Sequence, residues 1–201
     1  MLDKLGEIEA YFLPNMSEAS PSEITPEIVQ QRMKIFLRSP LRRQLLAREM
    51  RLLDKVGGQQ VLEMSGDEAL SAAMQNAGGG GGGIWNSVAT SETQAELLAE
   101  SGIGRIHLAA LPKLPFEEGA FDAVVLSEML EYVENPTDLM AELHRVMRSK
   151  TRLILHVRRK RRSLVGFFRR VAGLTDPTRP MVRPGFTPTE LFDVLKDGFD
   201  V

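Results

Sequence analysis

From residue 60 onward, short apolar runs alternate with longer segments in which apolar residues recur every three or four positions. The short runs predict β-strands at residues 60–64, 84–89, 105–109, 121–127 and 152–157, with a sixth strand starting at 198–201. The periodic segments predict helices at 67–77, 92–100, 136–147 and 187–196. Strands separated by helices predict an α/β fold with a mostly parallel, twisted sheet and helices on both faces.

The first quarter of the chain has a different pattern. Residues 1–24 are mixed and predict a loosely attached arm. A hydroxyl residue followed by proline occurs at 25–26 and again at 39–40, and each pair is typical of a helix start. We therefore predict two parts, with an N-terminal arm and helices at 1–56 that pack on a Rossmann-like domain at 57–201.

The amino-acid composition excludes several classes of function. The chain is 43% hydrophobic and 26% charged, as soluble globular proteins are. It has no cysteine, which excludes disulfides and thiolate chemistry, and its three histidines lack metal-ligand spacing, so we expect no metal site. We find neither a secretory signal nor an apolar run of the roughly 20 residues that a membrane span needs. We therefore expect a cytoplasmic protein, with peripheral attachment to a membrane as the alternative.

Charge is unevenly distributed, although the net charge is only −2. No acidic residue occurs between Leu143 and Thr175, a stretch that holds 11 of the 25 Lys and Arg residues. Part of it combines apolar residues at helical spacing with seven basic ones, Arg158, Arg159, Lys160, Arg161, Arg162, Arg169 and Arg170. This basic segment is interpreted in three ways: a lid packed on the fold, a surface that binds an anionic membrane, or a surface for a protein partner or, less favoured, nucleic acid.

Several segments, in this order, resemble the class I S-adenosylmethionine-dependent methyltransferases, and among them the quinone-biosynthesis enzymes. They are Leu114-Pro115-Phe116, the FDAVVLSEMLEYV of residues 121–133, the PTDLMAELHRVMR of 136–148, and the FTPTEL of 186–191 followed by Gly198-Phe199. The resemblance implies a Rossmann-like three-layer sandwich with a seven-stranded sheet. The family usually continues past the position of Val201, so we expect one or two last strands to be missing or truncated.

The same resemblance implies where S-adenosylmethionine would lie, across the ends of the first three strands. The positions that match the family's cofactor site are Glu63, Ser65, Gly66, Asp67, Ala69, Ala89, Ala110 and Ser127. Ser65, Asp67 and Ala69 stand at three positions where the family has glycine. Asp67 adds a negative charge where the methionine carboxylate of the cofactor would sit.

Two further positions lack the family's acidic residues. Ala89 matches the residue that accepts hydrogen bonds from the ribose hydroxyls, and Ala110 matches the one that meets the adenine amino group. Only Glu63 keeps its acidic character. Losing a charged hydrogen bond costs about 1.5–3 kcal/mol, so two losses together with the added charge of the loop would weaken cofactor binding on the order of a thousandfold or more.

Three functional hypotheses follow. The favoured one is a methyltransferase-like protein with a degraded cofactor site, which acts as a non-catalytic binding or scaffold subunit. The alternative is an active methyltransferase on a small or lipid-like substrate such as a quinone, because methyl transfer needs alignment more than a dedicated base. We assign no catalytic residue; Glu128, Glu131 and Tyr132 are either substrate-lining or structural. The third is a pocket for a cationic ligand beside Asp67 and Glu68.

Two further segments are distinguished by their glycine content: one consists of glycines and the other lacks them. The six glycines at 78–83 precede a strand, which is the opposite order to a phosphate-binding loop, so we interpret them as a surface loop. Ser149, Lys150 and Thr151 replace the family's Gly-Gly turn before the fifth strand.

Overall fold

A computed structural model describes residues 34, 38, 40–54, 60–66, 70–74, 83–160 and 181–200. The named elements are α3 (Pro40–Asp54), β1 (Gln60–Ser65), β2 (Ile84–Ala89), α5 (Glu92–Glu100), β3 (Ile106–Leu108), β4 (Phe121–Ser127), the 3-10 helix η2 (Leu130–Tyr132), α6 (Pro136–Val146), β5 (Met147–His156) and α8 (Pro188–Leu195). Within these ranges, no helix is long and apolar enough to cross a membrane.

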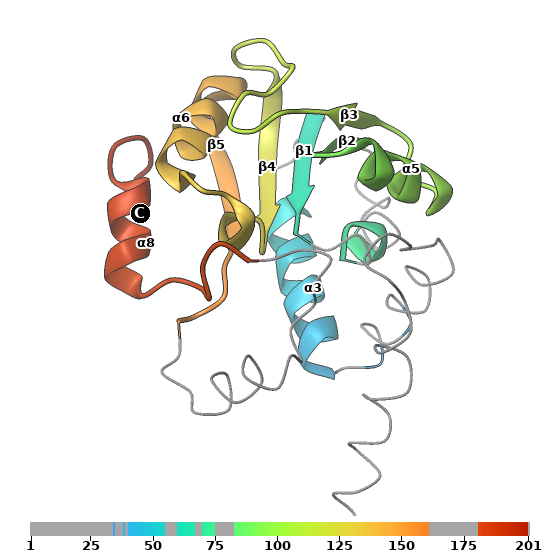
Figure 1. Cartoon of the computed structure of the whole chain (residues 1–201), viewed down its shortest axis with the longest axis horizontal. Helices are drawn as coiled ribbons and strands as arrows, with labels where there is room; N and C mark the ends of the chain where they lie inside the picture. Colours follow the sequence, from blue (N-terminus) through green and yellow to red (C-terminus); the bar gives the residue numbers. More distant parts are fainter. Residues whose placement is uncertain are drawn as a thin grey trace, which may run out of the picture.

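The strands form one parallel sheet in the order β3-β2-β1-β4-β5 (Figure 1). The chain runs outward from β1 to β3 on one side and from β4 to β5 on the other. The switch point of the topology therefore lies between β1 and β4. Ser65 pairs with Ser127 there, at the carboxyl ends of both strands. This arrangement confirms the predicted Rossmann-like α/β fold.

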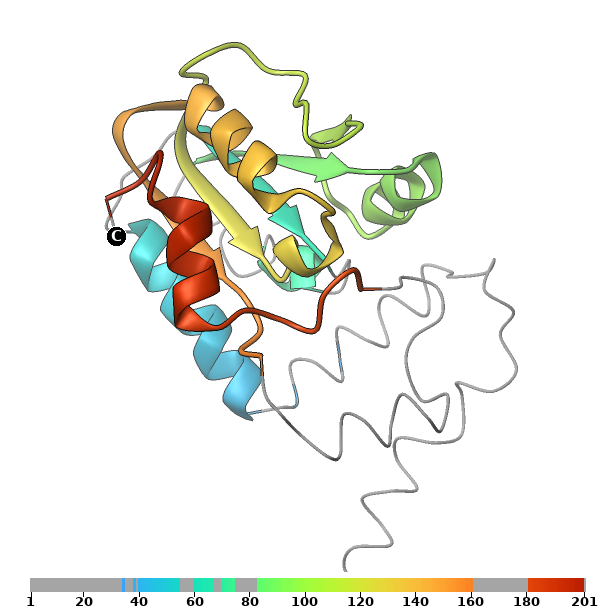
Figure 2. The same cartoon turned by 60° about the vertical axis from the view of Figure 1, so that its left-hand side comes forward.

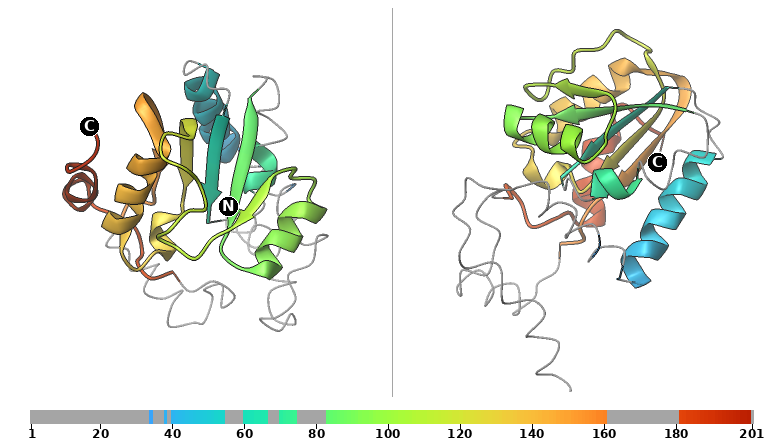
Figure 3. Two further views of the ribbon diagram at one scale, coloured as in Figure 1. Left: turned by 90° about the horizontal axis from the view of Figure 1, so that it is seen from above. Right: turned by 90° about the vertical axis from the view of Figure 1, so that its right-hand side faces the viewer.

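Helices cover both faces of the sheet because side chains alternate along each strand. On one face, Leu62 and Leu126 pack in the main core with Leu139 of α6. On the other face, Val61 packs with Leu46 of α3. Figure 3 shows the sheet between α3 and α6, and Figure 2 shows α8 beside α6.

Local capping signals fix the helix starts that the sequence predicts. Thr187 and Glu190 form a reciprocal capping box at the start of α8. The Ser91 side chain caps α5 by accepting a hydrogen bond from the Gln94 N–H at 3.2 Å. The predicted helix at 67–77 is present over its described part, residues 70–74. Residues 1–33, residues 78–82 of the glycine run, and Val201 lie outside the described residues.

The last predicted strand differs from the structure. Residues 198–200 are not a strand, because the N–H groups of Gly198 and Phe199 donate to the Leu195 carbonyl and close the end of α8. The sheet of the described residues has five strands, two fewer than the family's seven, of which we expect one or two to be missing or truncated. The segment that follows β4 forms a single 3-10 turn, η2.

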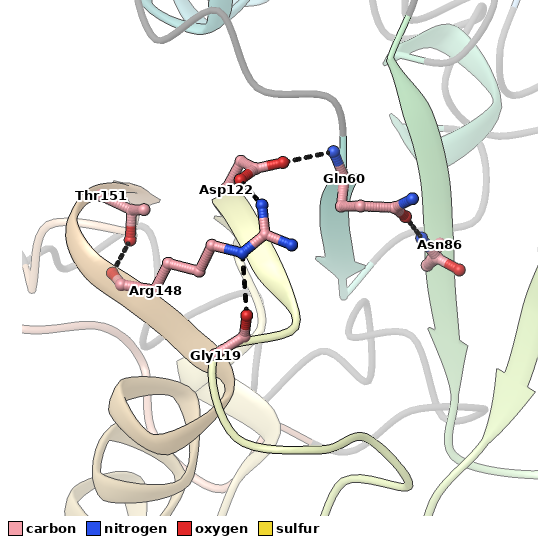
Figure 4. A network of polar contacts seen from close by, with 6 residues as sticks. All are labelled: Gln60, Asn86, Gly119, Asp122, Arg148 and Thr151. Atoms are coloured by element: carbon pink, nitrogen blue, oxygen red, sulfur yellow. Dashed lines mark hydrogen bonds and ion pairs between the residues drawn. The ribbon is translucent and has the colours of Figure 1, made fainter.

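The turn inside β5 has a backbone conformation that favours glycine, although the glycines that the family has there are absent. Phe121 pairs with Met147, but the next pair is Ala123 with Arg152, so the register shifts and residues 148–151 of β5 form an irregularity or bulge. Lys150 has φ 65°, the left-handed conformation that favours glycine. The Thr151 hydroxyl donates to the Arg148 carbonyl at 2.7 Å and closes the turn (Figure 4).

Figure 4 also shows a polar network at the amino ends of the strands. Asp122 accepts a hydrogen bond from the Gln60 N–H at 2.9 Å and pairs with Arg148. The Asn86 amide donates to the Gln60 side chain at 3.4 Å. These contacts tie β1, β2, β4 and β5 together at the edge opposite the switch-point residues, and they hold the strand ends in register.

Candidate functional site

Open parallel sheets bind ligands outside the carboxyl ends of their strands, at the topological switch point. In this protein that point is the ends of β1 and β4, where Ser65 and Ser127 are both buried. The Gly66 N–H donates to the Ser127 carbonyl at 3.0 Å. The loops that follow β1 and β4 therefore start in direct contact.

Gly66 has no room for a side chain. A Cβ at this position would lie 2.3 Å from the Glu128 carbonyl oxygen and 2.5 Å from Cε2 of Tyr132. The Gly66 backbone thus packs against the Tyr132 ring and the Glu128 backbone. The segments after β1 and β4 are thus in van der Waals contact at the switch point.

Glu63, near the end of β1, is 1% exposed and bonds within the fold. Its Oε1 accepts a hydrogen bond from the Ser71 hydroxyl at 2.8 Å, and its Oε2 accepts one from the Ser87 hydroxyl at 2.9 Å. Ser71 lies in the helical residues 70–74 and Ser87 in β2. A buried carboxylate needs such donors, so these two hydroxyls compensate its burial from within the protein.

The two alanines at the expected cofactor anchors have different environments. Ala89, at the end of β2, is fully buried and packs with Ala72, Leu98 and Ile103. Ala110 follows β3 and is exposed. Neither side chain can accept a hydrogen bond, and the Ala89 methyl belongs to an apolar cluster.

Part of the basic segment is paired with acidic residues rather than free. The Arg158 guanidinium donates to Oε2 of Glu128, from Nε at 2.9 Å and from Nη2 at 2.5 Å. Lys160 pairs with Glu190 of α8 at 2.6 Å. Arg159 is exposed. The other predicted members, Arg161, Arg162, Arg169 and Arg170, lie outside the described residues.

Glu131 of η2 is the most deeply buried acid near the switch point, with no exposed surface. Its Oε1 accepts a hydrogen bond from the Arg158 backbone N–H, whereas its Oε2 has no hydrogen-bond partner among the described residues. Burial raises the pKa of Glu131 above its ordinary value, because the charged form loses its hydration.

The structure therefore brings Ser65, Gly66 and Ser127 together and directs Glu63 to hydroxyls inside the fold. Asp67 and Ala69 lie outside the described residues. The sequence predicts Arg158 only as a surface cation. Its contacts with Glu128 and Glu131 were not predicted. No sequence signal marks this contact, since Arg158 and Glu128 are 30 residues apart on different strand ends. In the described part of the chain, no group of His, Asp and Glu could hold a metal ion.

Comparison with known proteins agrees with the fold. Residues 65–155 match a protein family described as a methyltransferase domain. A S-adenosylmethionine-dependent methyltransferase from Aquifex aeolicus has a TM-score of 0.56 at 15% identity, over 88% of each chain. One from Thermotoga maritima, described as a possible histamine N-methyltransferase, has a TM-score of 0.57 at 17% identity, over 86% of this chain and 77% of its own.

A third similar structure is geranyl diphosphate methyltransferase in complex with S-adenosylmethionine. Its TM-score is 0.55 at 18% identity, over 94% of this chain and 73% of its own. At such identities the likeness shows the fold alone. The sequence has no significant match among curated proteins.

Proposed function

Since residues 65–155 belong to the class I S-adenosylmethionine-dependent methyltransferase family, we propose that this chain keeps the family's fold with a degraded cofactor site. In this proposal it acts as a non-catalytic binding or scaffold subunit. The observation that carries the proposal is the contact of Gly66 with Tyr132 and the Glu128 carbonyl. In this proposal, a ligand at the switch point competes with this contact for the same place.

The strand ends support the same conclusion. A ribose needs an acceptor at the end of β2, where the Ala89 methyl is buried in an apolar cluster. An adenine amino group needs one after β3, where Ala110 has none. The remaining acid, Glu63, already accepts hydrogen bonds from Ser71 and Ser87. Each of the three polar contacts expected for the cofactor is thus either missing or used inside the protein.

The alternative function is active methyl transfer to a small or lipid-like substrate, for example a quinone. The retained acid at position 63 favours it, and so does the likeness to an enzyme that acts on geranyl diphosphate. It requires S-adenosylmethionine to bind, and cofactor binding therefore separates the two functions.

Isothermal titration of the whole chain with S-adenosylmethionine and S-adenosylhomocysteine tests the proposal. We expect no saturable binding below about 1 mM, which corresponds to a binding free energy of about −4 kcal/mol. Circular dichroism of the same sample confirms that the protein is folded. Micromolar affinity for either compound would reject the degraded site and favour the active enzyme.

A pair of variants tests whether the absence of an acidic residue after β3 weakens cofactor binding. Ala110→Asp restores a carboxylate at the exposed position after β3, and we expect it to bind the cofactor about tenfold more tightly than the natural chain. Ala141→Asp adds the same charge at an exposed position of α6 and should change nothing. Equal affinity of the two variants would assign the weak binding to the Gly66–Tyr132 contact alone.

As the binding surface of such a subunit, we propose the basic segment 158–174, with an anionic membrane or an acidic protein as its partner. Its basic side chains outnumber the acidic residues that pair with it among the described contacts. Flotation with vesicles of neutral lipid and with vesicles containing anionic lipid tests the membrane partner. At low salt the chain should float only with the anionic vesicles; no flotation would leave the protein partner.

A further inference from the structure

Three segments that are distant in the sequence meet at the carboxyl end of β4: the turn at 128–132, residues 158–160 after β5, and residues 181–187 before α8. Figures 1 and 2 both show the segment before α8 passing beside the turn η2. The Val182 and Arg183 N–H groups donate to the Glu131 carbonyl at 2.9 and 3.1 Å, which fixes this contact.

The turn after β4 is strained at its first residue. Glu128 has φ 50° although it carries a side chain. Such a conformation costs about 1–2 kcal/mol and persists only when the surroundings hold it. The Glu128 N–H donates to the His156 carbonyl at 2.8 Å, and its own carbonyl oxygen lies against Gly66. The strained residue is therefore the one that contacts the loop after β1.

Arg158 holds this turn at two points. Its guanidinium bonds the Glu128 carboxylate through Nε and Nη2, and its backbone N–H bonds the buried Glu131 carboxylate. We call Arg158, Glu128 and Glu131 the Arg158 cluster. Tyr132 follows Glu131 directly, so the position of its ring against Gly66 depends on the same contacts.

Arg158 is itself fixed by the segment before α8. Its carbonyl accepts a hydrogen bond from the Phe186 N–H at 2.8 Å, and the Lys160 N–H donates to the Phe186 carbonyl at 2.9 Å. Gly185, at φ 131°, allows this approach, since a Cβ there would lie 2.3 Å from the Arg158 carbonyl oxygen. The cluster is thus supported from outside the switch point.

We propose that the Arg158 cluster is a conformational latch, which holds Tyr132 and the Glu128 backbone against Gly66 and so keeps the ends of β1 and β4 in contact at the switch point. Release of Arg158 from Glu128 lets the strained turn relax and separates the two loops. The inference rests on the proposed function only for the role of the switch point. Its test uses no cofactor, so the two can fail separately.

Hydrogen exchange followed by mass spectrometry on the whole chain tests the proposal, with Arg158→Gln compared with Arg159→Gln. Both variants remove one positive charge, but Arg159 is exposed and lies outside the cluster. We expect Arg158→Gln to speed exchange about fivefold in peptides that contain Gly66 and residues 128–134, and Arg159→Gln to leave them unchanged. Unchanged exchange in Arg158→Gln would overturn the proposal.

Glu128→Gln weakens the same pair from the other side and decides the question if Arg158→Gln does not fold. It should give the same local increase, while a peptide covering 84–89 in β2 exchanges at its natural rate. Faster exchange throughout the chain, in place of a local change, would also overturn the proposal, because it would mean a general loss of stability.

Discussion

At Gly66, the absence of a side chain allows the loop after β1 to reach the turn after β4. The space that a Cβ would need is occupied by the Glu128 carbonyl oxygen and the Tyr132 ring. Ala89 and Ala110 could be identified from the sequence as positions that lack the family's cofactor-binding acids, because this needs only an alignment of motifs. The contact between Tyr132 and Gly66 could not be predicted from the sequence. It depends on the positive φ at Glu128, which no residue type signals.

Gly66→Ala should therefore destabilise the protein. The added methyl group meets backbone and ring atoms in a buried place, and overpacking of this kind costs about 1–3 kcal/mol. The free energy of unfolding in urea measures the effect. Gly104→Ala is the matched control, since a Cβ there would have open space and no positive φ is involved, and its stability should stay within about 1 kcal/mol of the natural chain. Equal stability of both variants would contradict the close contact at Gly66.

At the scale of elements, the helix starts and the central strands could be predicted because their signals are local. Ser91 and Thr187 cap the helices where the sequence places them, and the apolar run at β4 gives a buried strand. The last predicted strand was wrong because Gly198 and Phe199 complete the end of α8 instead. Nothing in a run of four residues distinguishes a helix end from a strand start.

The turn at Lys150 supports a prediction for β5. A non-glycine residue at φ 65° is strained, and replacing it with glycine removes the strain. Lys150→Gly should raise the free energy of unfolding by about 1 kcal/mol. Ser149→Gly, one residue earlier and without positive φ, should leave the stability unchanged or lower it. Thermal unfolding of the two variants measures the difference; a destabilised Lys150→Gly would show that the lysine makes a contact worth more than the strain.

Across the whole molecule, the basic surplus that the sequence places late in the chain is partly neutralised by folding. Arg145 pairs with Glu142, Arg148 with Asp122, Arg158 with Glu128 and Lys160 with Glu190. The sequence could show the charge imbalance but not these pairs, because three of them join residues 26 to 30 positions apart. A partner of the basic segment would therefore meet fewer free cations than the composition suggests.

A crystal structure of the whole chain grown in millimolar S-adenosylmethionine would show directly whether the ends of β1 and β4 hold the cofactor. We expect electron density in which Gly66 packs against Tyr132, Arg158 bonds Glu128, and the strand ends carry no nucleoside. A cofactor seated at full occupancy over Ala89 and Ala110, with Tyr132 moved away from Gly66, would contradict this expectation.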